Sequence, residues 1–254
     1  MTTRRRVKSC SRLARSRRLT ATEHRGCIAG VIASSADLNA AIVLKDLPDL
    51  FELRLDSLFP ITNHLEKKIA RLRAPLIITA RDPREGGTGN LSRETRRSLL
   101  RRFLPRASCL DVELRNAHHV KSLLADAKKR RVRRILSYHN FKSTPSSRSL
   151  CAKARQANAL GADIFKVATR TDSPAELARL VDFIMCCSGK RHSGSERVGR
   201  VQIAVMGIGK FGTISRLLLA RCGSVLNYAH LGRARVTGQP SVSEIRRWAL
   251  DVER

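Results

Sequence analysis

The sequence predicts an α/β fold, a single-domain (β/α)8 barrel of the TIM type, and three observations lead to that prediction. Short apolar segments alternate with longer amphipathic ones, the pattern of parallel strands joined by helices. The chain has 254 residues, and barrels of this kind run to about 250 residues as one domain. Its 42% hydrophobic and only 4% aromatic residues suit a core of Leu, Ile, Val and Ala.

Eight predicted strands follow one another through the chain, separated by segments long enough for a helix. They cover residues 27–33, 50–56, 76–80, 109–114, 134–139, 163–169, 201–206 and 225–230. Helical periodicity predicts helices over 92–103, 117–129, 147–160, 174–186 and 212–222, with a last helix from Ser243. A strand followed by a helix, repeated eight times, is typical of a closed parallel barrel.

The first 25 residues differ from the rest of the chain. They are rich in Arg and Ser, contain one acidic residue, Glu23, and have no sustained apolar period. We expect residues 1–25 to form a flexible basic extension and residues 26–254 to form the catalytic barrel. A transit peptide has the same composition, and a misplaced start codon would also explain it.

The Gly/Ser-rich connection at 186–200 leads into the amino end of a predicted strand. Barrel enzymes carry their chemistry at the carboxyl ends of the strands, so we expect this connection on the opposite face and not in a catalytic role.

Charge is the unusual feature of the composition, with 50 basic against 21 acidic residues and a net charge of +29. Such a charge favours anionic partners. The basic clusters at 96–106 and 128–134 nevertheless interleave with apolar residues at helical spacing. We interpret them as solvated helix faces, with nucleic-acid binding as the less favoured alternative because few aromatic residues are available for base stacking.

Apolar runs long enough to cross a bilayer are missing from the sequence, and so is the apolar stretch of a secretory signal. These observations predict a cytoplasmic protein without a membrane partner. The seven cysteines form no C-x-x-C pair and have no His at metal-ligand spacing, so no metal site is expected.

A G-x-G-x-x-G motif at residues 207–212 invites a dinucleotide-binding interpretation. Residues 197–243 contain no acid to bind a ribose, and only one predicted strand follows the motif. We therefore expect no nucleotide cofactor. Glycines that open a late barrel helix are better interpreted as an anion site, with Arg216 supplying a fork for a carboxylate.

Polar side chains lie at the carboxyl ends of the predicted strands, which is where a barrel carries its chemistry. Because side chains alternate along a strand, those spaced by two residues share one face. The residues concerned are Glu52, Arg54 and Asp56 on the second strand, Arg81 and Glu85 after the third, Asp111 and Glu113 on the fourth, His139 on the fifth and Lys166 on the sixth.

Lys166 is the most informative of these residues because it is a lone lysine in an apolar strand. Burying an ammonium group is costly, and desolvation favours the neutral amine, which can attack a ketone. We therefore favour a nucleophile. The alternative is an ion pair, whose acidic partner would be Glu52, Asp111 or Glu113, and the two roles can operate at different steps.

His139 ends the neighbouring strand, so its imidazole is expected within reach of the atoms beside Lys166. The ordinary pKa of imidazole suits proton transfer near neutral pH. We predict a general acid/base, with a buried structural histidine as the alternative.

Taken together, the polar segments resemble the type I 3-dehydroquinate dehydratase family from about Cys27 to Leu250. In the family's order and spacing they read ELRLD, ARDPREGG, DVEL, SYHNF, DIFKVAT, GTISR and GQPSV. The resemblance implies a hydro-lyase that converts 3-dehydroquinate to 3-dehydroshikimate by syn elimination of water in the shikimate pathway, in either a biosynthetic or a catabolic role. It also implies a homodimer and no external cofactor.

By resemblance, Lys166 forms a Schiff base with the substrate, His139 is the general acid/base, and Glu85 orients that histidine. The positions that match substrate-binding residues are Glu52, Arg54, Arg81, Arg216 and Gln239. A Schiff-base aldolase on the same barrel is the alternative enzyme, and a basic nucleic-acid-binding barrel without this activity is the alternative from another class.

Three residues depart from the family pattern, and one of them is Ile208, which stands where some members have Met. Arg235 stands where a substrate-contacting serine is usual, and Tyr228 stands at a common Phe position. We include Arg235 among the expected substrate-binding residues, where it either contacts a carboxylate of the substrate or points to solvent.

Overall fold

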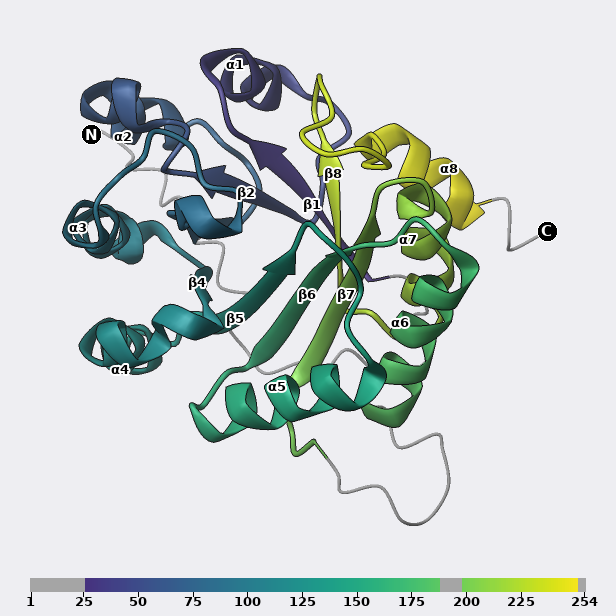
Figure 1. The fold of residues 1–254 in the computed structure, drawn as a ribbon. Coiled ribbons are helices and arrows are strands. Elements are labelled where there is room, and N and C mark those ends of the chain that lie inside the picture. Colours follow the sequence, from purple (N-terminus) through teal and green to yellow (C-terminus); the bar gives the residue numbers. More distant parts are fainter. Residues whose placement is uncertain (1–25, 188–197, 251–254) are drawn as a thin grey trace, which may run out of the picture.

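The computed structural model describes residues 26–187 and 198–250; the predicted extension 1–25 and most of the connection at 186–200 lie outside these ranges. Eight parallel strands form one sheet in the order β7-β6-β5-β4-β3-β2-β1-β8. The sheet curls into a barrel with the helices outside it (Figure 1). The predicted (β/α)8 fold is confirmed.

Each strand is followed by a helix on the outer surface of the barrel. The strands are β1 (Cys27–Ile32), β2 (Leu50–Arg54), β3 (Leu76–Thr79), β4 (Cys109–Glu113), β5 (Arg133–Asn140), β6 (Ile164–Arg170), β7 (Gln202–Ile208) and β8 (Leu226–His230). The helices are α1 (Ser35–Val43), α2 (Thr62–Ile69), α3 (Arg93–Phe103), α4 (Lys121–Lys129), α5 (Ser147–Ala159), α6 (Pro174–Cys187), α7 (Gly212–Arg221) and α8 (Val242–Leu250). The predicted strand bounds agree with these to within two residues.

Contacts between the starts of β7 and β8 bring the two ends of the sheet together. The amide of Val225 donates a hydrogen bond to the carbonyl of Ile203 at 2.9 Å. The buried hydroxyl of Ser224 accepts one from the amide of Val205, also at 2.9 Å. The barrel is thereby nearly closed.

Small and branched apolar side chains fill the barrel interior near the strand starts, among them Ala29, Ile77, Ile135, Ile164 and Ala204. A second apolar layer lies between the strands and the helices. There Phe165 of β6 meets Phe183 of α6 edge to face, with ring centroids 6.3 Å apart. These two apolar layers fill the barrel interior near the strand starts and the space between the strands and the helices. The polar side chains therefore gather toward the carboxyl ends of the strands.

The fourth helix starts later than periodicity predicts. Residues Leu114–Val120 form a 3-10 helix, and α4 begins only at Lys121. The side-chain amide of Asn116 donates hydrogen bonds to the carboxylates of Glu113 and Asp82, each at 2.9 Å. These contacts hold the tighter turn in place. None of the described helices is long and apolar enough to cross a membrane.

Candidate active site

Lys166 lies in the middle of β6 and points into the barrel, where it is 4% exposed. Its Nζ donates to Asp111 Oδ2 at 3.0 Å and to Glu52 Oε1 at 3.4 Å. The ring of Tyr228 on β8 covers the amine, with its centroid 3.8 Å from Nζ, a cation–π contact. Of the three acidic partners considered from the sequence, Asp111 and Glu52 therefore pair with Lys166, whereas Glu113 pairs elsewhere.

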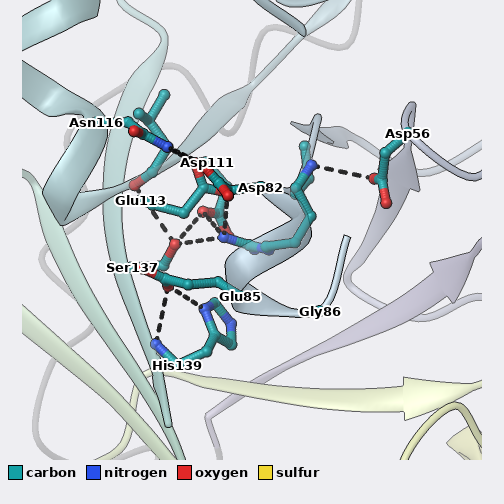
Figure 2. A network of polar contacts seen from close by, with 12 residues as sticks. Asp56, Asp82, Glu85, Gly86, Asp111, Glu113, Asn116, Ser137 and His139 are labelled. Carbon is teal, nitrogen blue, oxygen red and sulfur yellow. Dashed lines mark hydrogen bonds and ion pairs between the residues drawn. The ribbon is translucent and has the colours of Figure 1, made fainter. Parts of the chain in front are cut away.

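Arg81, just after β3, is also a buried cation. The side chains of Asp111, Glu113 and Ser137 lie close together in this network of polar contacts (Figure 2). The guanidinium of Arg81 donates two hydrogen bonds to the carboxylate of Asp111, at 3.2 and 2.9 Å. It also donates to Glu113 at 3.1 Å and to the hydroxyl of Ser137 at 2.6 Å. Burial opposes the charge of Arg81, but the neighbouring carboxylates outweigh it and raise the pKa well above its ordinary value. The guanidinium thus holds together the carboxylates that surround Lys166.

His139 near the end of β5 is held by Glu85 through two contacts. The imidazole Nδ1 lies 3.0 Å from Glu85 Oε2, and the backbone amide of His139 donates to the same oxygen at 3.0 Å. Burial, with the cations of Arg81 and Lys166, keeps the pKa of His139 well below its ordinary value. The imidazole is therefore neutral near pH 7. When Glu85 is ionised its carboxylate accepts a hydrogen bond from the Nδ1–H group, which leaves the unprotonated Nε2 as a base.

Glu85 lies on a 3-10 turn, Pro83–Glu85, directly after β3. Burial and the nearby charge of Glu113 raise the pKa of Glu85 to about 7. The turn is fixed by the buried carboxylate of Asp82, which accepts from Arg96 of α3 and from Asn116, each at 2.9 Å. The orientation of the imidazole thus depends on contacts that reach outward to α3 and to the segment after β4.

Arg54 at the end of β2 lies at the edge of this cluster. Its guanidinium donates two hydrogen bonds to the carboxylate of Asp56, at 3.0 and 2.8 Å, and a third to the carbonyl of Gly86 at 3.1 Å. Asp56 also accepts from the backbone amides of Arg81 and Thr88. The side chain of Arg54 is 16% exposed, so it remains partly accessible from outside while it ties β2 to the loop after β3.

Arg216 of α7 is a buried cation with a different environment. It donates to the carbonyls of Tyr228 at 3.0 Å and Gly238 at 3.2 Å, and no ion pair with an acidic side chain of the described residues is formed. Burial lowers its pKa to about 10. A buried guanidinium without a counter-ion is a strong site for an anion, and its fork suits a carboxylate.

The loop between β8 and α8 carries the last two expected residues. Gln239 is buried, and its Oε1 accepts a hydrogen bond from the backbone amide of Arg235 at 2.8 Å. The guanidinium of Arg235 forms an ion pair with Asp37 of α1. The sequence left open whether Arg235 meets a substrate carboxylate or points to solvent, and in the structure it pairs with this protein carboxylate.

Several residues of the cluster were not singled out from the sequence. Ser137 faces Lys166 across the β5–β6 register and lies two residues before His139, so strand alternation could have found it. The hydroxyl of Thr79 donates to Glu52 at 2.9 Å. The contact between Asn116 and Asp82 had no local signal, because the two residues are 34 positions apart.

Within the part of the chain that the structure describes, no group of three or more His, Cys, Asp or Glu side chains is arranged to hold a metal ion. The cluster instead contains a buried amine and a neutral imidazole on the adjacent strand, and Arg216, which has no counter-ion among the described residues, contacts the backbone of the same Tyr228 whose ring covers the amine. Such a set suits covalent amine chemistry with proton transfer on an anionic substrate. Fold and cluster together define an α/β-barrel enzyme centred on a lysine.

The sequence pattern of the type I 3-dehydroquinase family matches residues 27–251. The chain therefore belongs to the type I 3-dehydroquinase family, and the predicted enzyme class, a hydro-lyase of that family, is confirmed.

Individual relatives agree with this assignment. The 3-dehydroquinate dehydratase of Shouchella clausii (strain KSM-K16) is 32% identical over 216 residues, which cover 81% of each chain. That of Albidiferax ferrireducens is 30% identical over 217 residues, 81% of this chain and 79% of the other. The crystal structure of 3-dehydroquinate dehydratase from Geobacillus kaustophilus HTA426 has a TM-score of 0.76 and 25% identity, and the match covers 90% of this chain and 91% of that one.

Proposed function

We propose that the protein dehydrates 3-dehydroquinate to 3-dehydroshikimate through a Schiff base on Lys166. Family membership and the activity named for the relatives support the reaction. The observation that carries the mechanism is the buried Lys166 on β6 beside the neutral imidazole of His139 on β5.

In the first step, the deprotonated Nζ of Lys166 attacks the substrate ketone, and loss of one water gives a protonated imine. The carboxylates of Asp111 and Glu52 and the ring of Tyr228, which contact Nζ in the free enzyme, favour this cationic form electrostatically. The protonated imine then acts as an electron sink for the neighbouring carbon.

In the second step, Nε2 of His139 removes a proton from the carbon next to the imine carbon. The electron pair moves toward the imine nitrogen and returns to expel the hydroxyl group, which His139 protonates on the same side. Hydrolysis of the product imine consumes one water and frees Lys166. The net change is the loss of one water by syn elimination.

Arg216 is the residue proposed to bind the substrate carboxylate, because it is the buried cation that lacks a counter-ion among the described residues. The remaining substrate contacts are proposed for Glu52, Arg54, Arg81 and Gln239, whereas Arg235 already pairs with Asp37. Of these, Arg81 would act chiefly through the carboxylates it already binds. The place in the shikimate pathway, the homodimer and the cytoplasmic location stay predictions.

The test is incubation of the purified protein with 3-dehydroquinate while the ultraviolet absorbance of the conjugated product is followed. We expect turnover by the wild type and by Lys129→Ala, an exposed lysine at the end of α4, and none above background by Lys166→Ala. Folded wild-type protein that forms no product would refute the proposal. Carbon–carbon cleavage products would favour the aldolase alternative.

A further inference from the structure

The β8–α8 loop, residues 231–240, is held at one end by α7 and by the loop that precedes α7. The amide of Gly209 donates to the carbonyl of Thr237 at 3.0 Å, and Arg216 Nε donates to the carbonyl of Gly238 at 3.2 Å. Gly238 and Gly212 are in such close contact that a Cβ on Gly212 would lie 2.8 Å from the Gly238 Cα. This end of the loop is therefore positioned by backbone packing.

The other side of the loop is anchored to α1 by charge. Asp37 is a fixed acceptor, because its side chain is 7% exposed and its Oδ2 accepts the backbone amide of Ala33 at 3.0 Å. The Ser34 hydroxyl caps the same helix by accepting the amide of Asp37 at 3.1 Å. The guanidinium of Arg235 reaches across from the loop and pairs with the same Asp37 oxygen.

Arg235 is also connected to Gln239. The backbone amide of Arg235 donates a hydrogen bond to Gln239 Oε1 at 2.8 Å. Arg235 therefore binds α1 through its side chain and orients the side-chain amide of Gln239 through its backbone. We propose that the Arg235–Asp37 ion pair is a latch that holds the β8–α8 loop in its binding position, so that both residues position Gln239 for the substrate. This inference rests on the proposed function, because Gln239 is a proposed substrate contact.

A latch of this kind acts on binding more than on chemistry. The reacting groups are held by other residues: Lys166 is held by Asp111 and Glu52. His139 is held by Glu85, so loss of the ion pair is expected to leave the reacting groups in place. The side chain of Arg235 is 36% exposed, so the pair is partly screened and its contribution is moderate.

The experiment measures steady-state kinetics with 3-dehydroquinate for the wild type, Arg235→Gln, Asp37→Asn and the double variant. We expect KM to rise about threefold to fivefold in each single variant, with kcat within about twofold, as for loss of a partly exposed ion pair. The double variant is expected to match the singles, since either change opens the latch. Arg235→Lys, which keeps the charge without the fork, is expected to be intermediate.

Arg233→Gln is the matched control, because Arg233 is an exposed arginine in the same loop. It is expected to keep the wild-type KM. Added KCl should raise the KM of the wild type more than that of Arg235→Gln, because salt screens the pair. Hydrogen exchange of residues 231–240, which needs no substrate, should be faster in Arg235→Gln and Asp37→Asn than in the control.

Failure of the proposed function and failure of the latch would give different results. A wild type without turnover refutes the proposed function and leaves the exchange measurement as the test of the latch. An Arg235→Gln variant with normal KM and normal loop exchange overturns the latch. So does a raised KM in Arg235→Gln combined with a normal KM in folded Asp37→Asn, since that result means that Arg235 contacts the substrate itself.

Discussion

His139 is kept neutral by its surroundings, in which burial and two cations, Arg81 and Lys166, all lower its pKa. A neutral imidazole can accept a proton at once near pH 7, but a low pKa also makes it a weak base. Glu85 offsets that weakness when it is ionised, because its carboxylate stabilises the imidazolium that forms. The two side chains therefore work as one proton-transfer unit.

The acid/base role predicts that His139→Gln lowers kcat about 10²-fold to 10⁴-fold with a much smaller change in KM, because an amide cannot carry the proton. Steady-state kinetics measure both constants. His64→Gln, at an exposed histidine of α2, is the control and should behave as the wild type. Near-normal kcat in folded His139→Gln would remove the proposed role.

The pKa of about 7 at Glu85 predicts an acid limb in the pH profile of kcat/KM. Below pH 7 the carboxyl takes up a proton and no longer serves as an ionised acceptor for the imidazole, so kcat/KM is expected to fall as the pH decreases and to level off above pH 7. Glu85→Gln should lower kcat/KM and abolish this limb. A wild-type profile that is flat from about pH 5 to pH 8, judged against that ordinary titration range, contradicts the assignment.

At the scale of single residues, the sequence was most informative where a polar side chain interrupts an apolar strand. Lys166 and His139 were predicted on that ground, and the structure places both in one cluster. The sequence offered Glu52, Asp111 and Glu113 as partners of Lys166 but could not select among them, because charge pairing depends on the barrel register. Arg81 has three neighbouring carboxylates, whereas the contacts of Arg216 among the described residues are to carbonyl oxygens and a sulfur.

At the scale of elements, the glycines after β7 serve close backbone packing. The motif at 207–212 resembled a nucleotide loop, and the structure shows Gly212 packed against Gly238 of the β8–α8 loop. A side chain at this point would push the loop away from α7 and from Arg216. The glycine is therefore required by the junction between two loops of the barrel mouth.

Gly212→Ala is expected to destabilise the protein by about 1–3 kcal/mol, the usual cost of overpacking. Alanine is otherwise the better helix former, so a loss points to the clash with Gly238. Denaturant unfolding measures the change. Gly232→Ala is the control, because a Cβ there would meet only an Asp37 oxygen at 3.9 Å. Equal stability of the two variants would contradict the packing argument.

The boundaries of the elements followed from local pattern more closely than their contacts did. The strand predicted at 27–33 is β1 (Cys27–Ile32), and the helix predicted at 147–160 is α5 (Ser147–Ala159). The predicted start of the fourth helix was wrong because the Asn116 side chain binds not only the nearby Glu113 but also Asp82, which lies 34 positions away. Tertiary hydrogen bonds outweighed helical periodicity there.

At the scale of the whole molecule, most of the basic side chains that the structure describes are exposed or partly exposed. In the cluster at 96–106, Arg97 and Arg101 are exposed on α3, as expected for a solvated face. Arg96 is the exception, since it is buried and pairs with Asp82. Composition alone could not separate the structural arginine from its solvated neighbours, because that distinction depends on the burial of each side chain.

A net charge of +29 implies mutual repulsion within the folded state, which salt screens. We expect the melting temperature to rise when KCl is increased from about 0.05 M to about 0.5 M, by roughly 2–4 °C for each kcal/mol of repulsion removed. Chloride is preferred to sulfate, because sulfate also stabilises proteins by exclusion from their surface. An unchanged or lower melting temperature would mean that repulsion is not a significant cost.

The central claim is that Lys166 forms a covalent imine with the substrate. The direct test is borohydride reduction during turnover of 3-dehydroquinate, followed by mass spectrometry of the peptides. We expect a reduced adduct on the peptide that contains Lys166, with matching loss of activity, and none in Lys166→Arg. Unmodified Lys166 in wild-type protein that is turning over substrate under the same conditions would contradict the account.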